Sequence, residues 1–279
     1  MQLTDLSSRV IPANEYRRER WRNQLGWTRE ILRLGNTAQW ALRLSIAEIE
    51  QDAAFSAFAG IDRELVLLRG NGMRLMFGSG DADTDTNTNT HTHTHTCARK
   101  SGSASAHANG SATTAGIQTA ADARKGAGPD TSGAGSADEH AAVDGSWGAG
   151  ERLGANASRS RCVDLVPPYQ RVRFAGEEAV EAVLLDGPTQ DFNLMWRRDL
   201  LQTELLHRPL VGTMLFFADP GSAWAIHLLA GQASFGRDSG LPPLAAGDTA
   251  WLSAATRTRY VLDGGGELLA IRVSPLPEH

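Results

Sequence analysis

The chain has 279 residues, with 27 basic and 32 acidic side chains and a formal net charge of −5 at pH 7. Because the arginines are interleaved with acidic residues, we expect no basic surface of the kind that binds nucleic acid. No stretch approaches the roughly 18 apolar residues of a membrane helix, and the N-terminus lacks a basic start followed by an apolar run. The sequence therefore predicts a cytoplasmic protein with neither nucleic acid nor membrane as a partner.

Short strands dominate the predicted elements, taken in chain order. A short helix over Ala13–Arg20, with Asn14 as its cap, precedes them. Trp40–Ile49 alternates strictly, with large apolar side chains on one face and Arg43 and Ser45 on the other. A second helix is predicted over Asp199–Leu206. Turn signals of Gly, Pro and Asp-Gly separate most of the other predicted strands, which are Leu65–Leu68, Met73–Phe77, Arg171–Phe174, Ala182–Leu185, Phe192–Trp196, Met214–Phe217, Trp224–Leu229 and Glu267–Val273.

A low-complexity segment interrupts this pattern at residues 79–162. It opens with an alternating Thr tract over residues 81–96 and continues with mostly Gly, Ala and Ser. Such a composition buries too little apolar surface to offset the entropy of ordering the backbone, so we expect a disordered insert. Both cysteines, Cys97 and Cys162, lie within it, and 195 residues remain outside it. A chain of that size forms one domain or two small fused ones.

An internal repeat suggests two copies of one β unit. Similar apolar strands end at Gly70 and Gly231, and a second similar pair ends at Gly187 and Gly264. Gly231 and Gly264 are 33 residues apart, and Gly70 and Gly187 are also 33 apart once the 84-residue insert is removed. This spacing predicts an all-β fold of two barrel- or sandwich-like halves, at about 1–78 with 163–200 and at about 201–279. Chance matching of short apolar strings is the alternative.

Three strand-like segments place short polar groups on one face at a period of two. These groups are Thr28 and Glu30, Arg43 and Ser45, and Asp191 and Asn193. If the opposite apolar faces pack in the core, the polar groups face either bulk water or the interior of a barrel. The second alternative is a pocket with a few convergent polar groups, the usual form of a small-molecule site. Arg43 is then the natural partner of a ligand carboxylate, because its guanidinium binds two oxygens at once.

Four ordered segments resemble the signatures of the HutD/Ves family. Trp21–Ile31 reads W-R-N-x-x-G-x-T-x-E-I, and Trp40–Ala47, Phe55–Arg63 and Asp186–Met195 followed by Arg197 and Arg198 resemble the others. The resemblance covers nearly all of the 195 residues and none of the insert. It implies a bicupin, which has two cupin-type (jelly-roll) β-barrel halves in one chain. Gln24 is a departure, because the family often has glycine there, which takes positive φ more freely.

The resemblance also implies a function. It favours a non-catalytic regulator of histidine utilisation that binds a small carboxylated metabolite, with urocanate and N-formylglutamate as candidates. The signature residues carried over as ligand-binding positions are Trp21, Asn23, Thr28, Glu30, Arg43, Ser45, Arg63, Asp191 and Asn193. Several of them also admit purely architectural roles.

Other functions stay open. One alternative is a metal-independent isomerase or hydrolase that uses Glu30 or Asp191 as general base. A Ves-like role in stress response, a protein-interaction module with the insert as a tether, and a homodimer are the others.

Metal is not expected. A cupin metal site needs about three imidazoles and a carboxylate that converge from neighbouring strands. Outside the insert the chain has only His207, His227 and His279, and the run His91, His93 and His95 lies in the Thr tract. We therefore expect no metal and no other cofactor.

Overall fold

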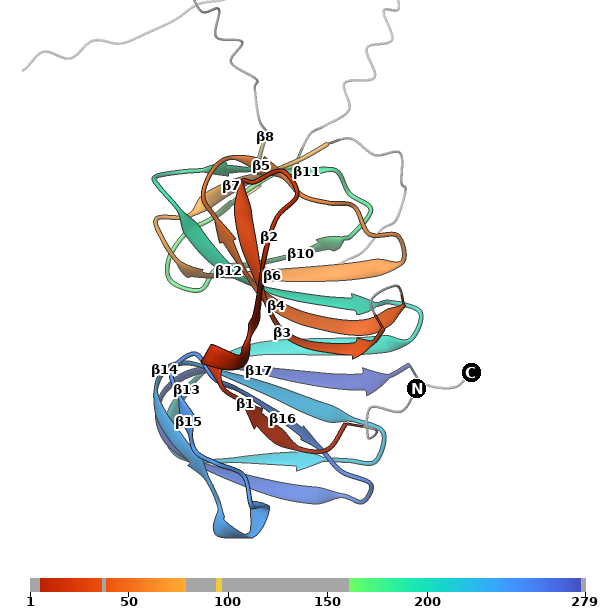
Figure 1. Cartoon of the computed structure of the whole chain (residues 1–279), viewed down its shortest axis with the longest axis vertical. Coiled ribbons are helices and arrows are strands. Elements are labelled where there is room, and N and C mark those ends of the chain that lie inside the picture. Colours follow the sequence, from red (N-terminus) through yellow and green to blue (C-terminus); the bar gives the residue numbers. More distant parts are fainter. Residues whose placement is uncertain (1–5, 37–38, 79–93, 97–160, 277–279) are drawn as a thin grey trace, which may run out of the picture. The chain divides into compact units, whose positions relative to one another are not determined.

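The computed structural model describes residues 6–36, 39–78, 94–96 and 161–276, and nearly all of its regular elements are strands. This confirms the predicted all-β fold. The strands form three antiparallel sheets, named here the central, outer and C-terminal sheets (Figure 1). No helix in the described part of the chain is long and apolar enough to span a membrane.

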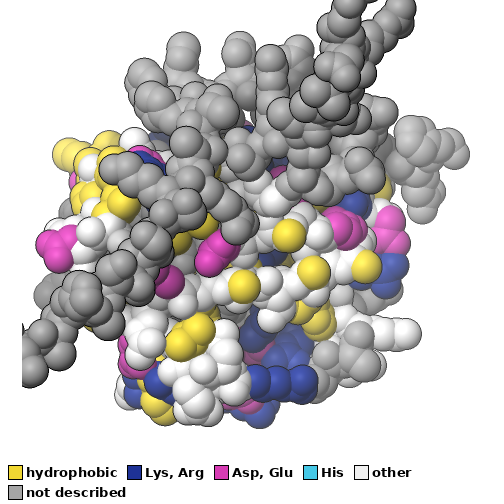
Figure 2. Space-filling model, turned by 90° about the horizontal axis from the view of Figure 1, so that it is seen from above, with side chains coloured by type: hydrophobic (Ala, Val, Ile, Leu, Met, Phe, Trp, Pro, Cys, Tyr) yellow, Lys and Arg dark blue, Asp and Glu magenta, His cyan; other side chains and the backbone are white. Residues whose placement is uncertain are grey.

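The central and outer sheets come from the N-terminal part and the middle of the chain. The central sheet has the order β10 (Arg171–Ala175), β6 (Ile61–Arg69), β12 (Thr189–Arg197), β4 (Trp40–Ile49), β3 (Gly26–Gly35) and β2 (Arg17–Arg20). The outer sheet has the order β5 (Ala53–Ala54), β11 (Val180–Leu184), β7 (Met73–Phe77), β9 (Arg161–Leu165) and β8 (Thr94–Thr96). Seen from above the outer sheet, basic side chains gather mainly at one edge of a face that otherwise mixes acidic and apolar groups (Figure 2).

The C-terminal sheet contains two 18-residue strands that pair along their whole length. Its order is β1 (Arg9–Ile11), β16 (Thr249–Ser253), β14 (Ala223–Phe235), β17 (Thr258–Pro275) and β13 (Leu201–Ala218), with β15 (Leu244–Ala245) paired to β14. Two short 3₁₀ helices, η2 (Ala13–Glu15) and η3 (Arg237–Ser239), complete the fold.

The central sheet is buried on both faces. On one face, Leu44, Val66 and Phe192 join a core with Leu269 and Ile271 of the C-terminal sheet. On the other face, alternate residues of the same strands point into the space between the central and outer sheets. The apolar part of that face packs against the outer sheet, in a cluster that includes Ile49, Leu65, Leu67, Met73 and Leu75. Because successive side chains of a strand point to opposite faces, one set of strands contributes side chains to two different cores.

Two predicted turn glycines lie inside strands instead. Gly231 is in β14 and Gly264 is in β17. Gly231 faces Gly266 of β17 just after a register shift between Leu228 and Ala230, and a Cβ atom on Gly231 would lie 1.9 Å from the carbonyl oxygen of Gly265. Glycine is needed here because the two backbones approach each other closely. In the sequence, such a glycine looks the same as one that marks a turn.

Both predicted helices were wrong. Only Ala13–Glu15 is helical, as one 3₁₀ turn, and Arg17–Arg20 extends as β2 to pair with β3. Leu201–Leu206 begins β13, with Leu201, Thr203 and Leu205 buried. Their alternation with exposed Gln202 and Glu204 is the period of a strand, and long-range pairing with β17 overrides the local helix propensity.

The predicted insert is described only at its two strand segments. Thr94–Thr96 forms β8, and Arg161–Cys162 begins β9, which pairs with β7. Cys162 is buried, so the insert boundary at residue 162 was wrong by two residues. Val163 and Leu165, which follow in the same strand, are buried as well. The rest of segment 79–162 lies outside the described residues.

The N-terminal segment belongs to the C-terminal sheet, whereas the predicted first half began at residue 1. Strand β1 pairs with β16, and the Ala13 backbone N–H donates to Asp248 Oδ1 at 2.8 Å. The Tyr16 hydroxyl donates to the Gly247 carbonyl at 2.6 Å and lies 2.7 Å from Thr249 Oγ1. Tyr16 thus joins the start of β2 to the other half.

Replacing Tyr16 with phenylalanine tests this junction. Tyr16→Phe should lower the free energy of unfolding by about 1–2 kcal/mol, because the half-buried Gly247 carbonyl loses this hydrogen bond and the buried Thr249 hydroxyl loses one of its two partners. We expect the midpoint of thermal denaturation to fall by about 3–6 °C. Ser239→Ala, which removes an exposed turn hydroxyl, is the control and should stay within about 1 °C. Equal shifts in the two variants would contradict the assigned role.

Candidate functional site

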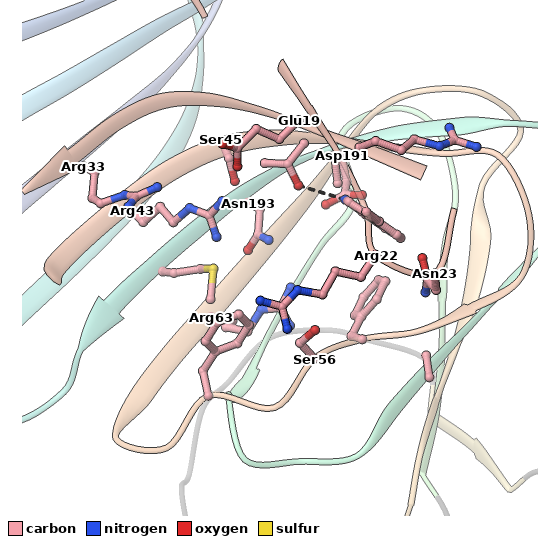
Figure 3. Close-up of a pocket in the computed structure, with 18 of the residues that line it drawn as sticks. Glu19, Arg22, Asn23, Arg33, Arg43, Ser45, Ser56, Arg63, Asp191 and Asn193 are labelled. Atoms are coloured by element: carbon pink, nitrogen blue, oxygen red, sulfur yellow. Dashed lines mark hydrogen bonds between the residues drawn. The ribbon is translucent and has the colours of Figure 1, made fainter. Parts of the chain in front are cut away.

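A cavity of about 660 Å³ lies over the inward face of the central sheet (Figure 3). The loop between β2 and β3 and the segment after β5 form its other walls. Its charged lining residues are Arg20, Arg22, Arg33, Arg43, Arg63, Glu19 and Asp191. Glu19, Arg22 and Asn23 at the mouth are exposed, whereas Ser45 and Asp191 at the floor are 1% exposed. The cavity therefore has a solvated entrance and a desolvated polar floor.

Cross-strand pairing arranges the inward side chains in rows. Arg33, Arg43, Met195 and Arg63 are successive partners across β3, β4, β12 and β6, and we call them the arginine row. The next row contains Glu30, Ser45 and Asn193, and the one after it contains Thr28, Ala47 and Asp191. Adjacent rows are two residues apart along β4 and β12, or about 7 Å. Basic groups thus occupy one end of the face and hydrogen-bond acceptors the other.

A β-bulge explains why Arg33 belongs to the arginine row. Strict alternation from Glu30 would place Arg33 on the opposite, apolar face. The register shifts between Glu30 and Leu32, so that Ile31 is the extra residue and Arg33 pairs with Arg43. The sequence carries no turn residue at this point, and Arg33 was therefore not among the predicted site residues.

Glu30 holds the end of the arginine row. Its Oε2 accepts hydrogen bonds from Arg43 Nε at 2.9 Å and from Arg33 Nε at 3.1 Å, with a further bond from Arg33 Nη2. Glu30 does not line the cavity. One carboxylate that binds two guanidinium groups reduces their mutual repulsion and fixes their orientation. This geometry assigns Glu30 to positioning and leaves it badly placed as a general base.

Arg63 lies at the other end of the row among phenyl rings. Its guanidinium carbon is 5.1 Å from the ring centroids of Phe55 and Phe174 and 5.8 Å from that of Phe58. The side chain is buried, and desolvation lowers the pKa of Arg63 to about 10, against the opposing effect of Asp191. The rings stabilise the cation through their π faces while they exclude water.

Asp191 and Asn193 present oxygens without hydrogen-bond partners. Neither carboxylate oxygen of Asp191 has a hydrogen bond in the described structure, and the same holds for Asn193 Oδ1. Burial raises the pKa of Asp191 to about 7, opposed by the charge of Arg63. A buried acid of this kind exchanges its proton near neutral pH.

The loop before β3 shapes the mouth. Trp21 Nε1 donates to Thr28 Oγ1 at 2.8 Å, and both residues line the cavity. Asn23 Oδ1 accepts from the Leu25 N–H at 3.1 Å. Gln24 adopts a φ of 62°, so the residue that replaces the family's common glycine still takes the left-handed conformation. Figure 3 shows Arg22 extending from this loop into the hollow.

Eight of the nine sequence-predicted site residues line the cavity, and Glu30 lies directly behind it. Sequence reasoning missed Arg22, Arg33, Trp40, Phe55, Phe58 and Met195 as lining residues. Several stand in loops, where no period fixes the direction of a side chain. Phe55 and Phe58 could have been predicted as lining residues, because they directly precede the strand that carries Arg63.

The described residues do not fit a cupin metal site. No group of three or more His, Cys, Asp or Glu side chains that can hold a metal occurs among them. His227 lies in the C-terminal sheet, where its Nδ1 is 2.9 Å from Thr249 Oγ1. Burial lowers the pKa of His227 to about 4, so its imidazole is neutral and belongs to the packing between the halves.

Two β halves in one chain, with a polar cavity inside one of them, define a cupin-like protein. Among solved structures, the chain is similar to HutD from Pseudomonas fluorescens SBW25 in a formate condition, with a TM-score of 0.58 and 18% identity over 97% of this chain and 100% of that one. A conserved protein of unknown function from Pseudomonas aeruginosa PAO1 gives a TM-score of 0.57 with the same identity and coverage. The formate complex of Lactobacillus farciminis oxalate decarboxylase gives 0.51 and 9% identity over 97% and 87%. At these identities the likeness establishes the fold alone.

Sequence comparison establishes the family. The HutD family profile matches residues 13–123 and 148–270, most of the chain, so this protein belongs to the HutD family. An uncharacterized 21.2 kDa protein encoded in the hutC 3′ region of Pseudomonas putida is 42% identical over 69 residues. That match spans 24% of this chain and about a third of the relative (36%). The predicted HutD resemblance and cupin-like fold are confirmed.

The raised pKa of Asp191 predicts a pH-dependent stability. The folded state binds the proton more tightly than the unfolded state, whose ordinary pKa is 3.8. The stability that neutral Asp191 contributes is therefore complete below about pH 4 and is lost as pH rises to about 7. Asp191→Asn removes this loss, so its melting midpoint should exceed that of the wild type by about 5–10 °C at pH 8 and by much less at pH 5.

Thermal melts between pH 5 and pH 8 provide the measurement. Asp238→Asn, at an exposed carboxylate, is the control and should follow the wild type at every pH. A constant difference between Asp191→Asn and the wild type over this range would show that Asp191 does not titrate as its burial implies.

Proposed function

We propose that this protein binds a small carboxylate-bearing metabolite in its cavity and acts, without catalysis, in the regulation of histidine utilisation. The observation that carries the proposal is the arginine row, whose side chains line one end of a cavity large enough for a small molecule. Five arginines and only two carboxylates line the cavity. Even with Glu30 behind them, positive charge is in excess, and an anion entering the cavity is attracted to it.

The arginines differ in how many of their N–H groups remain available to bind a ligand. Arg22 has no ion-pair partner in the described part of the chain, and Figure 3 shows it entering from the mouth. Arg43 uses Nε for Glu30, which leaves its Nη groups for a second carboxylate. Two guanidinium groups that approach from different walls fix the orientation of a bound carboxylate.

Urocanate and N-formylglutamate are the candidates we favour. Urocanate joins one carboxylate to an imidazole N–H, and N-formylglutamate joins two carboxylates to an amide N–H. The role in histidine utilisation is supported by membership of the HutD family and by the relative encoded in the hutC 3′ region.

A thermal-shift and calorimetry screen tests the proposal. We expect at least one of urocanate, N-formylglutamate, glutamate and formate to raise the melting midpoint, since a ligand at 100 times its Kd contributes about 2.7 kcal/mol. Arg43→Gln should weaken binding about 10- to 100-fold, because a charge-assisted contact to the carboxylate is lost. Arg208→Gln, at an exposed arginine of β13, is the matched control. No shift with any of the four, or equal losses in both variants, would contradict the proposal.

An enzymatic function is the second candidate, and the burial of Asp191 is the observation that favours it. A carboxyl group with a pKa of about 7 at the floor of a cavity is suited to general acid–base chemistry at neutral pH. In this alternative, NMR shows one of the screened compounds converted by the wild type. Asp191→Asn then abolishes turnover and Glu30→Gln does not. Binding without turnover over a day would exclude this alternative for those compounds.

A further inference from the structure

The floor of the cavity presents three hydrogen-bond acceptors close together on β12. They are the two carboxylate oxygens of Asp191 and Oδ1 of Asn193, and none has a hydrogen-bond partner among the described residues. Asp191 is 1% exposed and Asn193 is 8% exposed. Both side chains line the cavity, on the same face of the strand and two residues apart.

Unsatisfied acceptors are unusual in a folded interior. Most buried polar atoms find a partner, because an orphaned one loses its interaction with water and gains nothing. Thr189 Oγ1 on the same strand is also buried without a partner, but it does not line the cavity. At Asp191 and Asn193, in contrast, the oxygens without hydrogen bonds belong to neighbouring side chains that line the cavity.

We propose that the inner end of the ligand carries a hydrogen-bond donor, and that Asp191 and Asn193 select carboxylates with an N–H group at the end away from the carboxylate that the arginines bind. This inference rests on the proposed binding function and specifies its ligand class. The arginine row takes the anionic end, and the acceptors on β12 take the donor end. Asp191 and Asn193 are thus specificity-determining residues.

The spacing of the rows sets the size of such a ligand. Arg43 pairs with Met195, so Asn193 and Asp191 are two and four residues further along β12. Two residues of a strand span about 7 Å, and four span about 13 Å. The long side chain of Arg43 covers part of that distance, so a ligand of one to two row spacings reaches from the guanidinium groups to the acceptors.

This arrangement also excludes ligands. A purely apolar inner end leaves three buried acceptors without a donor. A second carboxylate that has no N–H donor beside it meets the carboxylate of Asp191 at close range, and like charges are disfavoured where water is excluded. The site should therefore discriminate between carboxylates of equal size by the hydrogen-bonding character of their far end.

Matched ligand pairs test the inference by isothermal titration calorimetry on the full chain at pH 7.5. Urocanate and cinnamate share an acrylate, but only urocanate carries a ring N–H. Glutamate and glutarate differ by an amino group. We expect the N–H-bearing member of at least one pair to bind about tenfold or more tightly in the wild type.

Asp191→Asn should reduce that preference to less than about threefold, while cinnamate, which has neither an N–H group nor a second carboxylate, keeps its affinity within about twofold. Thr189→Val removes another unpartnered buried oxygen from β12 and is the matched control, which should keep the wild-type preference. A circular dichroism spectrum and a thermal melt establish that each variant is folded.

The outcomes separate the two proposals. If both members of each pair bind equally well and Arg43→Gln weakens both, the donor selection is wrong and the carboxylate-binding function stands. If Asp191→Asn and Thr189→Val reduce the preference alike, Asp191 is not the selecting group. If no member binds, the proposed function fails together with the inference.

Discussion

The central sheet is buried on both of its faces, and this double burial determines where a ligand site can form. One face packs against the C-terminal sheet through side chains such as Leu44 and Phe192. That contact fixes the orientation of β4 and β12, so every alternate residue must point into the space covered by the outer sheet. Where those residues are apolar they fill the space, and where they are polar they line a cavity. The C-terminal half has no such division in its described core, where apolar residues such as Leu210, Leu228 and Leu268 pack together.

Charge on the inward face is arranged so that the fold can tolerate it. Glu30 neutralises part of the charge of Arg33 and Arg43, and phenyl rings shield Arg63. Asp191 balances Arg63 at a distance without a hydrogen bond between them. The partners of the guanidinium groups lie behind or beside them, and the buried oxygens of Asp191 at the cavity floor keep no hydrogen bond within the described structure. Such preorganisation reduces the reorganisation that binding requires.

Much of this arrangement was predictable from the sequence, because a strand has a strict period. Once Trp40–Ile49 and Phe192–Trp196 are taken as strands, Arg43 and Ser45 must share a face, and Asn193 must lie opposite the apolar Phe192 and Leu194. The rest depends on contacts between distant segments. The bulge at Ile31 brings Arg33 into the row, and pairing with β17 makes Leu201–Leu206 a strand. The pairing of β1 with β16 joins residues about 240 positions apart, which no local pattern encodes. Loop residues such as Arg22 and Phe58 follow no period at all.

A crystal structure of the protein grown with tens of millimolar of one small carboxylate tests the central claim most directly. Our account predicts that the carboxylate lies within hydrogen-bond distance of the Arg43 guanidinium, inside the cavity over the central sheet. The side chains of Arg33, Asp191 and Asn193 should face the same hollow. A carboxylate bound only on the outer surface or in the C-terminal half, with Arg43 turned away from the cavity, would contradict the account.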